Sequence, residues 1–250
     1  LVETEEGAFR SFLATELGVN DTEVLSWDMM CHDLTPSSPL GRNEEFYAAP
    51  RIDNLASCHA ALEALRDIES VASNTISAVV LFDHEEIGSE SSTGARGPML
   101  SHALERIAGT RAVSREQFLR SLSRSACISA DGAHAVHPNY VDRHEPGHQV
   151  VLNGGPVIKL NANVRYATDA ESSAVAQSAC RSAGVPFQQY AHRSNLPCGS
   201  TIGPITASQL GMLVVDIGSP QLSMHSAREM AGASDPAYLT AALKAFLSDG

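Results

Sequence analysis

Acidic and imidazole side chains follow the apolar stretches of this chain in a regular order. Glu85 and Glu86 come shortly after the apolar run AVVLF, and Asp131 follows CISA. Asp53 precedes a stretch with helical periodicity, and His225 follows the apolar run MLVVDIG in the same motif. In an open α/β sheet, ligands bind outside the ends of the strands, where such polar residues gather. The order of these residues therefore predicts that the five side chains meet in one site.

Two adjacent carboxylates in a closed site would repel each other unless a cation lay beside them. Carboxylates combined with imidazole suit zinc, manganese or cobalt better than copper or an iron–sulfur cluster. A two-metal site needs a bridging carboxylate, terminal ligands and a carboxylate that accepts a proton from water. Asp53 could be the bridge, and Glu85 could be the general base. The terminal ligands could be Glu86, Asp131 and His225. The alternative is that these acidic residues cap helices or stay solvated.

The elements that must position these residues follow the pattern of an α/β protein. Short apolar, β-branched runs alternate with stretches of helical periodicity, which predicts a mixed, mostly parallel sheet flanked by helices in three layers. We expect strands at SAVVLFDH, ACISADGAH, PVIKLN and MLVVDIG. We expect helices after Asp53 with an apolar stripe from Leu55 to Ile68, over residues 170–183, and at the C-terminus with Asp235 as its cap. The stretch EEGAFRSFLATELG predicts a further helix on the flank of the main domain, and residues 34–44 predict a loop.

Composition and missing motifs exclude several classes of protein. A formal charge of -12 argues against a nucleic-acid partner, which requires basic surfaces. No apolar run reaches the roughly 20 residues that cross a bilayer, and the first residues do not resemble a signal peptide. Five scattered cysteines without a CxxC pair favour a reducing cytoplasm over a disulfide framework. HExxH, GxSxG, the Walker A loop and GxGxxG after a strand are all absent, which disfavours serine hydrolases and nucleotide-binding enzymes.

Six ordered motifs resemble the aspartyl aminopeptidase family of dinuclear zinc peptidases. They are APRIDNL, LFDHEEIGSESSTGA, SADGAHAVHPNY, GPVIKLN, PCGSTIGPI and DIGSPQLSMHSAREM, and the similarity runs from about Leu17 to the C-terminus. The resemblance implies a zinc-peptidase fold, two zinc ions and a large homo-oligomer. It also implies that a zinc-activated water removes an N-terminal Asp or Glu from peptide substrates. The roles that it implies for Asp53, Glu85, Glu86, Asp131 and His225 agree with those read from spacing.

A preference for acidic N-terminal residues requires a cation near the substrate side chain. Lys159, in the apolar motif GPVIKL, is our candidate, with the alternative that it extends to solvent from an edge strand. His134 and His137 follow Asp131 closely and are candidate substrate-binding residues. Of the two, His137 is the candidate to polarise the scissile carbonyl, because Pro138 restricts the backbone after it. The alternative for each histidine is a hydrogen-bonded structural role.

The chain also departs from the family pattern. Family members are longer and carry a first zinc-ligand histidine, with an aspartate after it, before the matching region. Near this position the chain offers only His32 and Asp33, in a different context. Gly132 stands where relatives carry a larger apolar residue, and we expect it to loosen a turn after Asp131. We expect residues 1–45 to be a helix and loop left from the family's second domain, and residues 46–250 to be the catalytic domain.

Three explanations of this departure stay open: a fragment or processed form, a protein completed by a partner chain, or a degenerate relative. Two rival functions also stay open. One is a non-catalytic metal-binding or assembly module, and the other is a metal-dependent deacylase of acidic acylated amino acids.

Overall fold

The computed structural model describes residues 6–249, which divide into two units between Leu34 and Thr35. In the first unit, α1 (Glu6–Leu17) is followed by the short 3-10 helix η1 (Asp21–Glu23). Gly18, with φ +68°, ends α1 in the left-handed conformation that glycine adopts without strain. The Phe9 and Trp27 rings pack edge to face with centroids 5.6 Å apart, and Ala14 is 1% exposed. The predicted N-terminal helix is therefore present.

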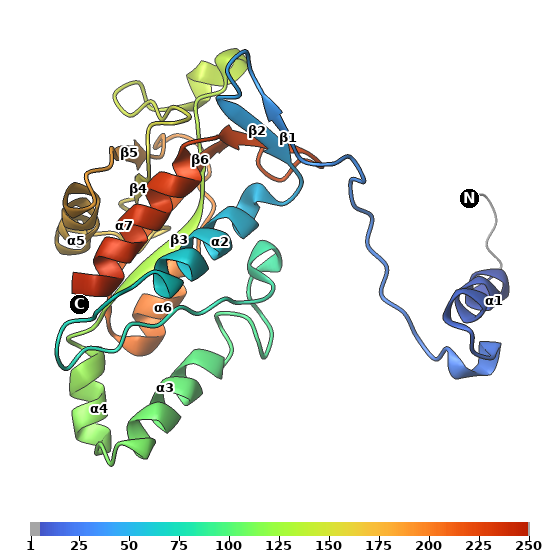
Figure 1. Ribbon diagram of the computed structural model, residues 1–250, viewed down its shortest axis with the longest axis horizontal. Helices are drawn as coiled ribbons and strands as arrows, with labels where there is room; N and C mark the ends of the chain where they lie inside the picture. The colour runs from blue at the N-terminus through green and yellow to red at the C-terminus, as the bar shows by residue number, and fades with distance from the viewer. Residues whose placement is uncertain (1–5, 250) are drawn as a thin grey trace. The chain divides into compact units, whose positions relative to one another are not determined.

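The second unit is built on a seven-stranded sheet (Figure 1). Its strands are β1 (Ser38–Leu40), β2 (Phe46–Ala49), β3 (Ala126–His134), β4 (Val157–Leu160), β5 (Gln188–Ala191), β6 (Leu213–Leu222) and β7 (Glu229–Gly232). The order is β1-β2-β7-β6-β4-β5, with β3 paired to β6. The β3–β6 and β4–β5 pairings are parallel and the other four are antiparallel, so the sheet is mixed, as predicted.

Helices flank this sheet and carry the connections between its strands. They are α2 (Ile52–Arg66), α3 (Met99–Thr110), α4 (Arg115–Leu122), α5 (Ala170–Ser182), α6 (Gly203–Leu210) and α7 (Asp235–Asp249), with 3-10 turns η2 (Glu85–Ile87) and η3 (Pro138–Arg143). Val215 and Ile217 of β6 form one core with residues of α2, α5 and α7, including the fully buried Leu239. Asp216, between them, contacts Thr201 on the opposite face, because side chains alternate along a strand. Figure 1 shows α2 and α7 side by side across the first of these faces.

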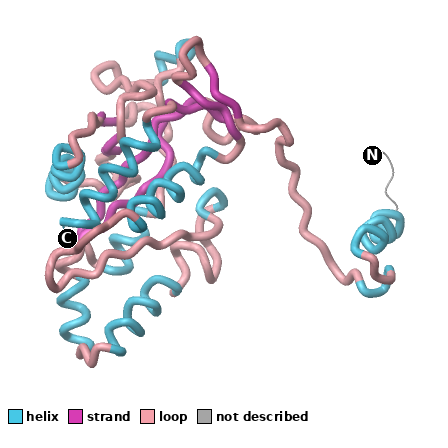
Figure 2. The backbone as a smooth tube through the Cα atoms, in the orientation of Figure 1, coloured by secondary structure: helices cyan, strands magenta, loops and turns pink. Residues whose placement is uncertain are grey.

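Four sequence-based expectations differ from this structure. The first concerns SAVVLFDH, which is not a strand: Figure 2 shows the chain between α2 and η2 as loop. Val79 packs against the core, whereas Val80 and Leu81 are 39% and 46% exposed. Apolar, β-branched content favours an extended backbone, but a strand also needs a neighbour for its hydrogen bonds. Among residues 6–249, none forms a ladder with this segment.

The other three differences concern the faces and boundaries of elements. Helix α2 buries Ala60 and Ala64. Of the predicted apolar stripe, Leu65 and Ile68 pack against the core, whereas Leu55 is 57% exposed. The small alanines let α7 approach closely, and this packing overrides the simple apolar pattern. The predicted loop over residues 34–44 contains β1, which pairs with β2. Asp235, predicted to cap the C-terminal helix, is the first residue of α7. Its side chain accepts hydrogen bonds from the N–H groups of Asn153 and Gly155, so it anchors a distant loop.

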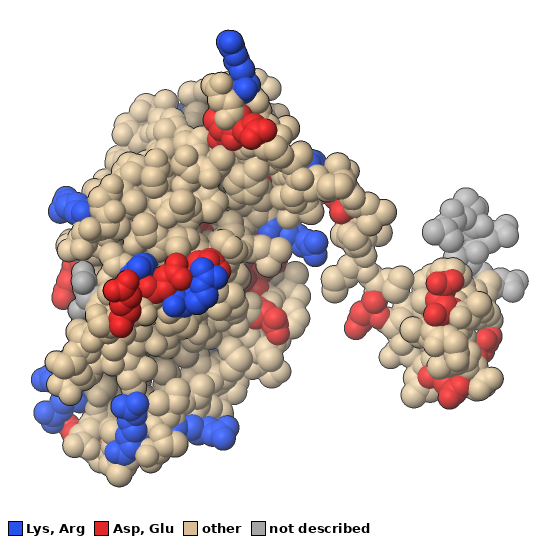
Figure 3. All heavy atoms as spheres, in the orientation of Figure 1, with Lys and Arg blue, Asp and Glu red and all other residues tan. Residues whose placement is uncertain are grey.

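The surface of the second unit carries both signs of charge. On the face shown in Figure 3, Lys and Arg side chains are interspersed with Asp and Glu side chains. Within residues 6–249, no helix combines the length and apolar character needed to span a membrane.

Candidate metal centre

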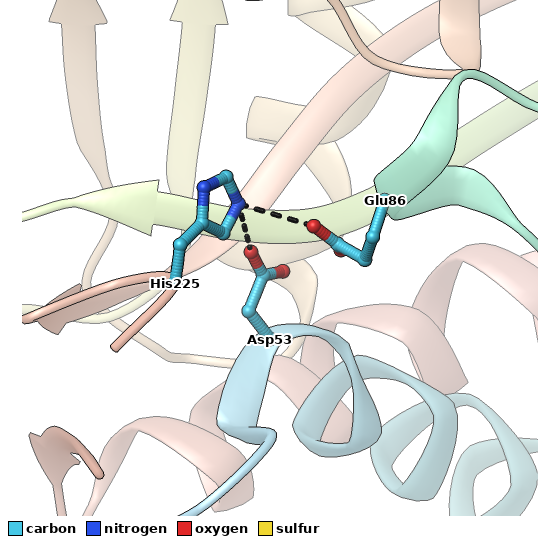
Figure 4. Close-up of side chains that lie close together, drawn as sticks. All are labelled: Asp53, Glu86 and His225. Carbon is cyan, nitrogen blue, oxygen red and sulfur yellow. Dashed lines mark ion pairs between the residues drawn. The ribbon is translucent and has the colours of Figure 1, made fainter. Parts of the chain in front are cut away.

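Three predicted ligands from separate parts of the chain converge in the second unit. Asp53 lies at the start of α2, Glu86 in η2, and His225 in the turn between β6 and β7. His225 Nε2 lies 3.3 Å from Asp53 Oδ2 and 3.1 Å from Glu86 Oε2. Figure 4 shows the imidazole pointing toward both carboxylates. The structure thus brings these three predicted ligands together, and their role as ligands stays a prediction.

The backbone that carries these side chains is irregular. Asp53 and Asn54 depart from helical φ/ψ values at the start of α2, and the peptide bond between them is cis. His225 has a φ of +65°, in the left-handed region. The Asn54 side chain donates to the carbonyl of Ala130, 2.9 Å away, and so ties the start of α2 to β3 beside Asp131.

The three ligand atoms surround a space that suits a cation. They all lie within 4.8 Å of one another, beside an open pocket of about 390 Å³. The Asp53 side chain is 4% exposed, and its Oδ1 is buried without a hydrogen-bond partner among residues 6–249. A buried carboxylate oxygen without a donor is costly, and a divalent cation would satisfy it. One imidazole and two carboxylates are a donor set that zinc accepts. The residues present therefore fit a metal ion.

Asp131 and Lys159 form a second, more buried part of the site. Asp131 Oδ1 accepts from the Gly132 N–H at 2.8 Å, and its Oδ2 lies 3.4 Å from Lys159 Nζ. Lys159 is 3% exposed and belongs to β4, which lies between β5 and β6. The alternative that this lysine extends to solvent from an edge strand is therefore wrong. Its ammonium also faces the Tyr166 ring, 5.4 Å from the centroid.

The clustered carboxylates affect one another's ionisation. Burial, then the charge of Asp131, raises the pKa of Asp53 to about 8. Burial, followed by the charges of Asp131 and Glu86, likewise raises the pKa of Glu85 to about 7, and the pKa of Glu86 is also raised, chiefly by burial. Burial would raise the pKa of Asp131 as well, but Lys159 and local hydrogen bonds lower it below its ordinary value. Without a further cation, these carboxylates resist ionising together.

The two histidines after Asp131 have different surroundings. His134 is an exposed residue at the end of β3, and partial desolvation of its ring, with the nearby charge of Lys159, lowers its pKa, so the ring is neutral near pH 7. His137 instead caps η3: its Nδ1 accepts from the Asn139 N–H at 3.1 Å, and its ring lies 5.1 Å from that of Tyr140. The structure thus places His134, rather than His137, in the electrostatic neighbourhood of Lys159.

Two further residues at the site escaped sequence reasoning. Tyr166 has no motif that marks it, and only the fold brings it to Lys159. Glu229 lies four residues after His225 in SMHSAREM, is 2% exposed and lines the same pocket. Gly132 also differs from expectation, since it lies within β3 opposite Ser219 and not in a turn. A Cβ added there would lie 2.9 Å from Asp53 Oδ1, so residue 132 packs directly against the site.

The fold and the site together define an α/β metalloprotein whose centre is built from carboxylates and an imidazole. Residues 3–247 match the Peptidase_M18 family, described as aminopeptidase I zinc metalloprotease (M18). The chain belongs to this family, which confirms the resemblance seen in the sequence at the level of M18.

Known relatives agree with this assignment and are longer. The chain is 50% identical over 247 residues to a probable M18 family aminopeptidase 2 of Mycobacterium bovis, covering 96% of this chain and 57% of the relative. A chain of the Ape4 and Nbr1 complex shares 37% identity with a TM-score of 0.87, covering 97% of this chain and 48% of its own length. The Saccharomyces cerevisiae mApe1 dodecamer shares 30% identity with a TM-score of 0.82, and the match covers 96% of this chain and 54% of the mApe1 chain. This chain therefore spans about half the length of the relatives that it matches.

Proposed function

We propose that this chain is the metal-binding, catalytic part of a zinc aminopeptidase. The observation that carries the proposal is the convergence of Asp53, Glu86 and His225 in a chain of the M18 family. Asp53 Oδ2 lies 3.3 Å from His225 Nε2, and its other oxygen, Oδ1, is buried without a hydrogen-bond partner among the described residues. Two ions would be held, with Asp53 between them, Glu86 and His225 as terminal ligands, and Asp131 as a ligand of the second ion. Zinc, when bound, would lower the pKa of water from about 15.7 towards 7 and polarise the substrate carbonyl. Manganese or cobalt could occupy the same donor set.

The chain's own residues then bind the substrate and move the proton. Glu85 accepts a proton from the attacking water and delivers it to the leaving amine, as general base and then general acid. Its position next to Glu86 keeps its carboxylate beside the ligands. His134, neutral near pH 7, can donate a hydrogen bond to the scissile carbonyl from the ring nitrogen that carries its proton. His137 remains a candidate for the same contact, although η3 engages its Nδ1.

We further propose that the substrate carries an N-terminal Asp or Glu. Lys159 supports this because its ammonium lies at the site and is nearly buried. An ammonium has three N–H donors, and the contact with Asp131 uses one of them, so the others can bind a substrate carboxylate. A compact ammonium provides a point charge for a carboxylate, whereas arginine binds one through a planar fork.

The assembly and location of the protein are also proposals. The relative solved as a dodecamer supports a large homo-oligomer for the whole protein. All five cysteines are free in the structure, which supports a reducing compartment such as the cytoplasm.

A metal-binding module without hydrolysis is the second candidate. Two observations favour it: Asp131 contacts Lys159, and only Asp53, Glu86 and His225 form a compact ligand group among the described residues.

Release of the N-terminal residue from an unblocked Asp-peptide, with added zinc, tests these functions against each other. Glu85→Gln should abolish release, whereas Glu116→Gln, a matched change on the exposed face of α4, should leave it intact. A parallel series of N-terminal Glu, Leu and acetylated Asp substrates separates acidic preference, general aminopeptidase activity and deacylation. Zinc binding without hydrolysis of any of these peptides would support the non-catalytic module.

A further inference from the structure

Glu229 connects the two ends of the candidate metal centre through their backbones. It begins β7 and pairs in register with Ala49 of β2, so its own backbone is held in the sheet. Its Oε2 accepts from the Asp53 N–H at 2.9 Å, and its Oε1 accepts from the His225 N–H at 2.8 Å. One buried carboxylate thus holds the main-chain amides of two candidate ligands.

Both amides belong to residues whose backbone is irregular. Asp53 lies at the non-helical start of α2, where the first N–H groups have no intrahelical acceptor. His225 adopts a φ of +65° in a tight turn. Local secondary structure offers neither residue a regular partner. Both amides need acceptors, and the Glu229 carboxylate provides them. Its position therefore affects where the backbones of Asp53 and His225 lie.

We propose that Glu229 is a positioning residue that sets the separation of Asp53 and His225 for metal binding. The inference rests on the proposed metal centre. Glu229 lines the pocket, and each of its oxygens accepts a backbone N–H of a candidate ligand. It is not one of the three side chains whose ligand atoms converge, so its contacts are those of an orienting residue. A charged acceptor also makes each of these hydrogen bonds stronger than a neutral carbonyl would.

Two substitutions separate positioning from charge. Glu229→Gln keeps the length of the side chain but has one accepting oxygen, so one of the two amides loses its partner. Glu229→Asp keeps the charge but is one methylene shorter and cannot reach both amides. Positioning predicts that both variants bind zinc roughly 10- to 100-fold more weakly, the range found when partners that orient metal ligands are removed. Charge alone predicts that only Glu229→Gln is impaired.

Asp235 provides a matched control elsewhere in the unit. It is fully buried and also accepts two backbone N–H groups, from Asn153 at 2.7 Å and Gly155 at 3.0 Å. Neither of those loop residues is a candidate ligand. We therefore expect both Asp235→Asn and Glu229→Gln to lower the melting temperature of the metal-free protein. Asp235→Asn should leave zinc affinity unchanged.

The experiment measures zinc affinity by competition with a chromophoric chelator, melting temperature without metal, and amide hydrogen exchange around Asp53 and His225. We expect weakened zinc binding and faster exchange at both amides in Glu229→Gln and Glu229→Asp only. Wild-type affinity in Glu229→Asp, or an equal loss of affinity in Asp235→Asn, would overturn the inference. If wild-type protein binds zinc but cleaves no peptide, the proposed catalysis fails while this inference stands. If it binds no zinc, the metal centre and its positioning residue both fail.

Discussion

Lys159 Nζ lies 3.4 Å from Asp131 Oδ2, and the two side chains are 4% and 14% exposed. A nearly buried ammonium thus faces a nearly buried carboxylate beside the candidate metal centre. The pair lowers the pKa of Asp131 against the opposing effect of burial, so Asp131 stays ionised where its neighbours resist ionisation. Lys159 is therefore part of the electrostatic balance of the site before any substrate arrives.

Replacing Lys159 should destabilise the protein. Lys159→Met leaves the Asp131 carboxylate buried without its partner, and breaking such a pair costs about 3–5 kcal/mol. Urea unfolding of the metal-free protein measures this loss. Lys244→Met, at the chain's other lysine, should shift the free energy of unfolding far less. Equal effects from the two substitutions would contradict the structural importance of the pair.

The stability of the metal-free protein should fall between acidic and mildly basic pH. Burial raises the pKa of Asp53 from 3.8 to about 8, so over this window the folded state holds a proton that the unfolded state has lost. The free energy of unfolding therefore falls as pH rises from about 4 to 8. Urea unfolding with a chelator present, at intervals of pH, should show this decline and show a smaller one in Asp53→Asn. A flat profile in the wild-type protein would contradict the raised pKa.

Zinc should stabilise the folded protein and weaken the pH dependence. A ligand at 100 times its dissociation constant adds about 2.7 kcal/mol to the free energy of unfolding. A thermal-shift titration with zinc should thus raise the melting temperature, and a chelator should reverse the change. His225→Ala should remove most of the shift, whereas His102→Ala, on the exposed surface of α3, should retain it.

The core between α7 and the sheet should be sensitive to loss of volume. Leu239 is fully buried against residues of α2 and β6, so Leu239→Ala should cost about 2–5 kcal/mol. Leu119, on α4, is 50% exposed, and Leu119→Ala should change stability by less than about 1 kcal/mol. Denaturant unfolding of both variants gives the comparison directly.

Much of the fold could be predicted because its signals are local. The runs at β3, β4 and β6 are apolar and β-branched, and α5 ends before Gly184, whose φ is +66°. The strand predicted at SAVVLFDH is absent and part of the apolar stripe predicted after Asp53 is exposed, for a common reason. Each depends on what packs beside it, and neither a missing ladder partner nor the close approach of α7 is written in the segment itself.

The sequence by itself determined the chemical types at the site and their order along the chain, because polar residues after apolar runs carry a local signal. The adjacent carboxylates, the imidazole and the motifs shared with the family can all be recognised in the sequence. Only the tertiary structure decided that Asp53, Glu86 and His225 meet, that Lys159 pairs with Asp131, and that Glu229 holds two of the ligands by their amides. Distances between side chains far apart in sequence are set by sheet register, turn geometry and helix packing, which depend on the whole chain at once.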